Sequence, residues 1–178
     1  MALIVEDGTG LADAESYNSL EEIAEYATNH GLTFAISPAE AAEAAARRAT
    51  TWLDGTYRGR YSGTRLNGRD QALQWPREDA TDAEDEDIAT DEVPAEIKAA
   101  HAEAAIRELA SPGVLNPDFV SGTQAVRKKV GSIEVEYRDV VMGPEMVRPV
   151  VNVVDDILAP LLGNSRSPVI SGESSRAW

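Results

Sequence analysis

Three stretches of the chain place apolar residues at the spacing of an amphipathic α-helix, and they constrain its fold more than any other feature. They cover residues 19–27, 37–53 and 93–110. In the second stretch the expected buried face is largely alanine, and small side chains allow helices to pack closely. The sequence therefore predicts a mainly α protein built as a small helical bundle.

Start signals sharpen the expected boundaries of these helices. Ser16 or Asn18 is placed to cap the first helix. Before the second, Ser37 stands at the N-cap, proline follows at the first helical position, and Glu40 completes a capping box. We expect that helix to end near Asp54-Gly55.

The pattern changes after residue 124. Residues 125–130 and 133–137 alternate as two strands around Gly131-Ser132, a dipeptide that suits a tight hairpin turn. The residues before the turn are basic and those after it acidic: Arg127, Lys128, Lys129, Glu134 and Glu136. Pairing of these charges across the hairpin is the expected role, and a contact between subunits is the alternative.

The remaining segments complete the expected domain organisation. A further short helix is predicted from about Pro149 to Leu158. Residues 2–5 suit an edge strand. We expect one helical domain over residues 1–163, with a protruding hairpin at about 125–138, and a flexible, extended C-terminal arm over residues 164–178.

Charge is plentiful and unevenly distributed. The 178 residues include 16 Lys+Arg and 31 Asp+Glu, a formal net charge of −15. The segment from Glu78 to Glu92 holds nine acids and no base, whereas Arg47 to Arg77 holds seven arginines against two aspartates. A solvated, self-repelling, extended loop is the expected form of this acidic run over residues 78–92, and pairing with the arginines or with another subunit are the alternatives. Such an acidic chain is not expected to bind nucleic acid generally, because phosphate binding depends on cationic side chains.

Several classes of chemistry are excluded or disfavoured. The chain has no cysteine, which excludes disulfides, cysteine-zinc sites and thiol nucleophiles. Its two histidines, His30 and His101, are too few for a multi-histidine metal site, and we expect His101 to be structural. No nucleophile elbow, phosphate-binding loop or dinucleotide-binding motif is present, so we expect no enzyme activity and no cofactor. No apolar run has the length of a membrane span and no signal peptide is evident, which makes the cytoplasm the default compartment.

Residues 56–93 form a long segment without clear periodicity, and such segments are often functional or disordered. Within it, Leu73-Gln74-Trp75-Pro76-Arg77 is apolar enough to dock on the core. We expect Trp75 to be a core anchor, with a contact surface as the alternative.

Several short motifs recur in an order that resembles one known family. They are Met1–Gly10, Ala14–Tyr17, Ala49–Asp54, Tyr57–Arg60, Ala72–Arg77, Val93–Ile97, Lys129–Tyr137 and Leu158–Leu162. In this order the chain resembles the head-to-tail adaptor, or connector, proteins of tailed bacteriophages and gene transfer agents. Many of those proteins carry the automatic label of a DnaT-like single-stranded-DNA-binding protein.

This resemblance implies a structural virion protein of the neck, made in the host cytoplasm. Such adaptors form a ring, commonly a dodecamer, beneath the portal and extend the DNA channel towards the tail. The implied partners are the portal protein, a stopper or tail-terminator protein and further copies of the chain. Genomic DNA would pass through without sequence-specific binding, and no membrane, cofactor, metal or catalytic residue is implied.

The resemblance also suggests contact residues by position. Candidates for binding the portal lie in the last helix and the arm: Leu161, Leu162, Val169, Ile170, Arg176 and Trp178. Candidates for contacting a neighbouring subunit or the next ring are Arg127, Lys128, Lys129, Glu134, Glu136, Arg58 and Arg60.

A single-stranded-DNA-binding module is the alternative function. The segment 57–77 interleaves cations with aromatic rings that could stack on bases: Arg58, Arg60, Arg65 and Arg69 with Tyr57, Tyr61 and Trp75. The net charge and the acidic run directly downstream favour the adaptor instead.

Overall fold

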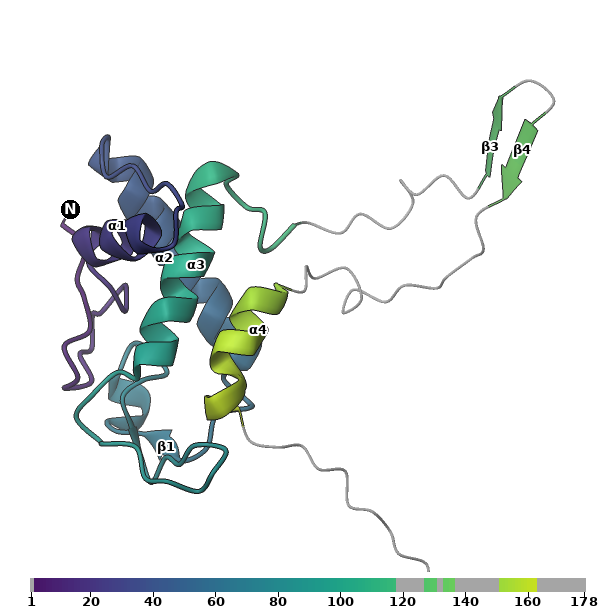
Figure 1. Ribbon diagram of the computed structural model, residues 1–178. Coiled ribbons are helices and arrows are strands. Elements are labelled where there is room, and N and C mark those ends of the chain that lie inside the picture. The colour runs from purple at the N-terminus through teal and green to yellow at the C-terminus, as the bar shows by residue number, and fades with distance from the viewer. Residues whose placement is uncertain (1, 118–126, 131–132, 137–150, 163–178) are drawn as a thin grey trace, which may run out of the picture.

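The structure is a computed structural model that describes residues 2–117, 127–130, 133–136 and 151–162 (Figure 1). Its helices are α1 (Leu20–Asn29), α2 (Ala39–Tyr57), α3 (Ala95–Ala110) and α4 (Asn152–Leu158). Helix α3 lies at the centre and contacts each of the other three (Figure 1). The expected mainly α fold with a β-hairpin is confirmed.

Alanine-lined faces join α2 and α3, the two helices in most extensive contact. The alanines on these faces are fully buried: Ala42, Ala45, Ala46 and Ala49 on α2, and Ala100, Ala104 and Ala105 on α3. Because these side chains are short, the two backbones approach closely, and larger residues fill the ends of the contact. Leu53 and Ile97 are among those larger residues and have no exposed surface.

The start of α1 differs from expectation by one residue. Ser19 is the N-cap, where its hydroxyl accepts a hydrogen bond from the Glu22 amide and the Glu22 carboxylate accepts one from the Ser19 amide. This is the reciprocal capping box that satisfies two free amides of the first turn. Ser16 is not the cap because its hydroxyl donates to the backbone oxygen of Asn18, 2.7 Å away.

Both predicted ends of α2 were wrong. Pro38 is the N-cap and no side chain caps the helix, so the capping box expected at Ser37 is absent; the Ser37-Pro38 peptide bond is cis. The helix also continues past Gly55 to Tyr57. Asp54 does not stop it, because the Asp54 carboxylate is bound by other parts of the chain and its carbonyl accepts from the Arg58 amide.

The predicted hairpin is present. Strand β3 (Arg127–Val130) pairs antiparallel with β4 (Ile133–Glu136), and the register sets Arg127 opposite Glu136 and Lys129 opposite Glu134. The register thus places basic positions opposite acidic ones, as cross-strand charge pairing requires. Residues 125–126 and 137–138 of the expected hairpin, and the arm over 164–178, lie outside the described residues.

Two other expectations for the ends of the domain need correction. The N-terminal segment contributes one parallel bridge, between Val5 and Ser16, in place of an edge strand over residues 2–5. Helix α4 begins at Asn152 and is followed by a 3-10 turn, η3 (Ala159–Leu161), which accommodates Pro160. Leu162 then forms a bridge with Tyr61, so the end of this unit is tied to the segment after α2.

The segment between α2 and α3 is more ordered than its sequence suggests. It contains a small antiparallel pair, β1 (Thr64–Arg65) with β2 (Arg77–Glu78), and the 3-10 turn η1 (Gly68–Asp70). Trp75 lies in the same segment, is 1% exposed and belongs to the hydrophobic core. Trp75 is therefore the core anchor that was predicted.

The acidic run is a folded turn, which corrects the expected extended loop. Thr81 pairs with Asp87, and an Asp82 carboxylate oxygen accepts hydrogen bonds from the amides of Glu84 (2.8 Å) and Glu86 (3.0 Å). The Ala83 amide donates to the Pro160 carbonyl at 2.7 Å, which anchors the turn near the end of α4. Within the described residues none of the nine acids forms an ion pair, so the predicted alternative of pairing with the upstream arginines is not seen.

Candidate functional site

A buried polar junction joins three segments that are distant in the sequence. Tyr17 Oη donates to Asp54 Oδ1 at 2.6 Å and accepts from the Gln74 amide at 3.0 Å and the Trp75 amide at 3.3 Å. Asp54 Oδ2 accepts from the same Gln74 amide at 3.1 Å. Helix α2 thereby fixes both the N-terminal segment and the loop that carries Trp75.

The surroundings of this junction shift the pKa values of Asp54 and Tyr17. Burial raises the pKa of Asp54 to about 6, although the hydrogen bonds from Tyr17 and Gln74 lower it. Burial, together with the neighbouring Asp54 carboxylate, raises the pKa of Tyr17 well above its usual value. A shifted carboxyl group beside a hollow can indicate a functional site. Here both carboxylate oxygens accept hydrogen bonds from the chain itself, so the arrangement acts as an anchor of the loop.

Arg77 completes the inner face of this loop. Its guanidinium donates to the backbone oxygens of Ser62 and Gly63, both at 2.7 Å, and to that of Gln74 at 3.2 Å. It also lies 5.9 Å from the ring centres of Tyr61 and Trp75. Burial lowers the pKa of Arg77. This arginine holds the loop together and is not placed to meet a phosphate.

The three aromatic residues proposed as stacking platforms are all inside the protein. Tyr57, Tyr61 and Trp75 are 2%, 7% and 1% exposed. Tyr57 Oη donates to Asp155 on α4 at 2.7 Å, and the Tyr61 and Trp75 rings meet edge to face at 5.6 Å. Base stacking needs an open ring face, which none of these residues offers in this structure.

The arginines of the same segment have separate surroundings. Arg58 and Arg69 are exposed and form no ion pair with a described residue. Arg60 lies 3.9 Å from Asp155 and over the Tyr57 ring, whereas Arg65 donates to the Gln71 carbonyl at 3.1 Å. The segment therefore presents Arg58, Arg60 and Arg69 to solvent without an aromatic partner open to a base.

His101 is fully buried and hydrogen-bonded on both ring nitrogens. Nε2 lies 3.1 Å from the Ala46 carbonyl and 3.0 Å from the Thr50 hydroxyl, and Nδ1 lies 3.3 Å from the Asn18 amide nitrogen. A neutral ring that donates from Nε2 and accepts at Nδ1 satisfies these partners. Burial lowers the pKa of His101 to about 4. These contacts agree with the structural role predicted for His101.

The candidate contact residues fall into three groups. Leu161 and Leu162 are 4% and 5% exposed, so they pack in the core of this chain and offer little surface to a portal. Val169, Ile170, Arg176 and Trp178 lie outside the described residues. For the hairpin candidates the structure describes the strand pairing only, and Arg58 and Arg60 lie on the surface beyond α2.

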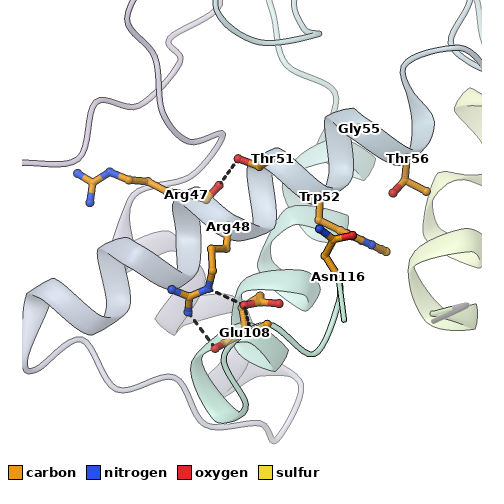
Figure 2. A pocket seen from close by; sticks show the side chains of 9 residues that line it. Arg47, Arg48, Thr51, Trp52, Gly55, Thr56, Glu108 and Asn116 are labelled. Carbon is orange, nitrogen blue, oxygen red and sulfur yellow. Dashed lines mark hydrogen bonds and ion pairs between the residues drawn. The ribbon is translucent and has the colours of Figure 1, made fainter. Parts of the chain in front are cut away.

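A groove of about 490 Å³ lies between α2 and the turn that follows α3 (Figure 2). Its lining residues come from both sides: Arg47, Arg48, Thr51, Trp52, Gly55 and Thr56 on α2, and Glu108, Gly113 and Asn116 opposite. We call it the α2 groove. Glu108, 2% exposed, shapes it by accepting hydrogen bonds from Arg48 Nε (2.6 Å) and from the amides of Gly113 (2.8 Å) and Leu115 (3.1 Å).

Sequence reasoning did not find the α2 groove. Glu108, Gly113 and Asn116 belong to no motif, and their proximity to α2 depends on how α3 crosses it. One sequence signal was available. Glu108 shortly precedes the turn that contains Gly113, and an acidic side chain in that position can accept hydrogen bonds from the amides of such a turn.

Two other kinds of feature are absent from the described residues. No group of three or more potential metal ligands lies together in the described ranges. No helix in the same part of the chain is long and apolar enough to cross a membrane.

Comparison with known proteins places the chain by family. The family model described as "Putative DnaT-like ssDNA binding protein" matches residues 1–177. The chain belongs to this family. No curated protein and no solved structure matches it. The family description is the one that the motif order had suggested, and the head-to-tail adaptor role that the same resemblance implied goes beyond what this match establishes.

Proposed function

We propose that the chain is a structural, non-catalytic subunit of the head-to-tail adaptor ring beneath a phage portal. The observation that carries this proposal is the burial of Tyr57, Tyr61 and Trp75, the rings on which a single-stranded-DNA binder of this sequence would rely. The residues in the motifs that carry the family resemblance stabilise the fold. The exposed surface is then available for contacts with other proteins.

Charge supports protein contacts over DNA contacts. The acidic run is folded into a turn, its side chains are mostly exposed, and they form no ion pair with described residues. A formal net charge of −15 repels phosphates at long range. A subunit with these properties in the wall of a channel would let DNA slide past without binding it.

The arrangement also provides elements for assembly. The β3–β4 hairpin sets basic positions against acidic ones, and Arg58 and Arg60 lie on the surface after α2. Contacts between unlike faces of neighbouring copies close into a ring when the rotation between copies is right. Portal, stopper or tail-terminator proteins and further copies of the chain are the proposed partners, and the virion neck is the proposed location.

Single-stranded-DNA binding is the second candidate, favoured by the description of the family to which the chain belongs. In this structure it would depend on exposed Arg58, Arg60 and Arg69 with no stacking platform from Tyr57, Tyr61 or Trp75. Binding of that kind is electrostatic, and therefore weak and strongly dependent on salt.

The adaptor proposal is tested by co-assembly with the portal protein of the same virus, imaged by electron microscopy. The full chain and a shortened chain ending at Gly163 are compared. A ring that forms on the portal with the full chain supports the adaptor role, and loss of that ring on shortening assigns portal docking to residues 164–178. Absence of any association of the full chain with portal or virion would refute the proposal.

The DNA candidate is tested separately by titrating a fluorescent oligonucleotide at low salt. If the chain binds DNA, Arg58→Gln with Arg69→Gln weakens the binding and lowers its salt dependence, whereas Lys98→Gln, which removes a cation paired with Glu22, is the matched control. Lack of binding at low salt eliminates this candidate. Tight binding that persists at high salt would instead contradict the adaptor assignment.

A further inference from the structure

Trp52 places an unpaired donor in the α2 groove. Its side chain is 8% exposed and packs edge to face on Tyr57, with ring centres 5.9 Å apart. The indole nitrogen forms no hydrogen bond with any described residue, and the ring lines the groove (Figure 2). It is not one of the buried polar atoms that lack a partner among the described residues, which are Tyr61 Oη and Trp75 Nε1. The Trp52 N–H is therefore accessible to a ligand in the open groove.

Other groups in the α2 groove are open in the same way. The Asn116 side-chain amide lines the groove from the opposite side and forms no hydrogen bond with a described residue (Figure 2). Gly55, which also lines the groove, exposes helix backbone, since an added Cβ would meet no atom within 4 Å. An indole donor and a side-chain amide in one groove suit the backbone carbonyls and amides of an extended peptide.

We propose that the α2 groove is occupied by residues 164–178 of the same chain, anchored by Val169 and Ile170. The described structure places Leu162, its last described residue, beside the segment that follows α2. Leu162 bridges to Tyr61, and Tyr57 Oη donates to Asp155 on α4 at 2.7 Å, so the end of the α4 unit lies beside the residues that follow Thr56. Val169 and Ile170 come seven and eight residues after Leu162, a reach of roughly 25 Å in extended chain.

The chemistry of this segment matches the site. Val169-Ile170 is an apolar pair between Pro168 and Ser171, and we expect it to pack against the Trp52 ring that lines the groove. The segment carries two arginines and one glutamate, net +1, whereas the rest of the chain has 14 bases and 30 acids, net −16. This opposite sign favours long-range attraction of the segment to the acidic body. The groove itself is lined by Arg47, Arg48 and Glu108, so apolar and backbone contacts must hold the segment there. The inference goes beyond the adaptor role and does not depend on it.

A single spin label can test the docking in the full chain. Because the chain has no cysteine, Ser171→Cys carries the label alone. The readout is the nuclear magnetic resonance signal of the Trp52 indole N–H, identified by its disappearance in Trp52→Phe. We expect this signal to lose most of its intensity next to the active label and to recover when the label is reduced.

Two variants and a mixing experiment decide the interpretation. Val169→Asp with Ile170→Asp should abolish the intensity loss, whereas Ser174→Asp with Ser175→Asp, which adds the same charge nearby, should preserve it. An unaffected Trp52 signal in the labelled chain would overturn the proposal. So would an equal loss when isotope-labelled, label-free protein is mixed with spin-labelled protein, because the segment would then come from a second copy.

Discussion

His101 and Asp54 should give this protein two opposite pH dependences of stability that nearly cancel. The pKa of His101 is lowered from 6.5 to about 4 by burial, and the pKa of Asp54 is raised from 3.8 to about 6 by burial. Between pH 4 and 6.5 the unfolded chain holds the His101 proton more tightly than the folded chain, so acid destabilises the fold. Between pH 3.8 and 6 the folded chain holds the Asp54 proton more tightly, so acid stabilises the fold.

The size of each effect follows from these pKa values. The limiting slope is about 1.4 kcal/mol per pH unit for one proton, and each group reaches most of it between pH 6 and pH 5. Over that unit His101 should remove about 1 kcal/mol from the free energy of unfolding, and Asp54 should add about 1 kcal/mol. These two contributions therefore largely offset each other in the unmodified chain.

Single variants separate the two contributions. His101→Gln leaves Asp54 to act alone, so stability should rise as the pH falls from 6 to 5; Asp54→Asn leaves His101 alone, so stability should fall. Chemical denaturation at each pH, followed by circular dichroism, measures these slopes independently of each variant's absolute stability. His30→Gln and Glu25→Gln are matched controls because both side chains are exposed. Equal slopes in the two core variants would refute this account of the junction and of the buried histidine.

Four further predictions each concern one substitution, and each is measured by denaturant unfolding. Gly8 has φ +100°, and a Cβ there would lie 2.1 Å from the Asp91 carbonyl oxygen, so Gly8→Ala should destabilise the fold by at least about 2 kcal/mol; Gly55→Ala, in open space within α2, should stabilise it by about 1 kcal/mol. Tyr17→Phe should lose about 1–3 kcal/mol, because the Trp75 amide loses its acceptor, and should move the acid-stabilised range of Asp54 to higher pH. Glu108→Ala should lower the free energy of unfolding by about 2 kcal/mol, because Arg48 and the amides of Gly113 and Leu115 lose their acceptor. A loss no larger than that of exposed Glu25→Ala would contradict this prediction.

Local patterns in the sequence were enough to predict the helices and the hairpin. Apolar spacing located α1, α2 and α3 because each buries one face or more against the others, and the strand-like alternation on either side of Gly131-Ser132 located β3 and β4. The helix ends were less predictable. Ser37 had the right neighbours for a cap but does not act as one, and Gly55 did not stop α2 because the helix still has Tyr57 to bury.

Long-range polar contacts could not be predicted from the sequence. Tyr17 and Asp54 are 37 residues apart, and Tyr17 and Gln74 are 57 apart, so no local pattern relates them. The prediction for the acidic run was wrong because a polar contact gave more order than the sequence indicates. Repulsion among its charges predicts an extended loop, but the Asp82 carboxylate binds two backbone amides and folds the chain back on itself.

The buried junction also explains what the family resemblance can and cannot say about function. Tyr17, Asp54, Gln74, Trp75 and Arg77 each lie in a motif that carries the resemblance, and all of them meet around one loop inside the protein. A sequence match that depends on such residues reports that the fold is shared, since their roles are to position backbone. We expect function to reside on surfaces outside this junction: the folded acidic turn, the hairpin and the α2 groove. For that reason a DNA-binding description attached to the family does not by itself require DNA binding by this chain, and experiments on the surfaces carry more weight than further matches to the core.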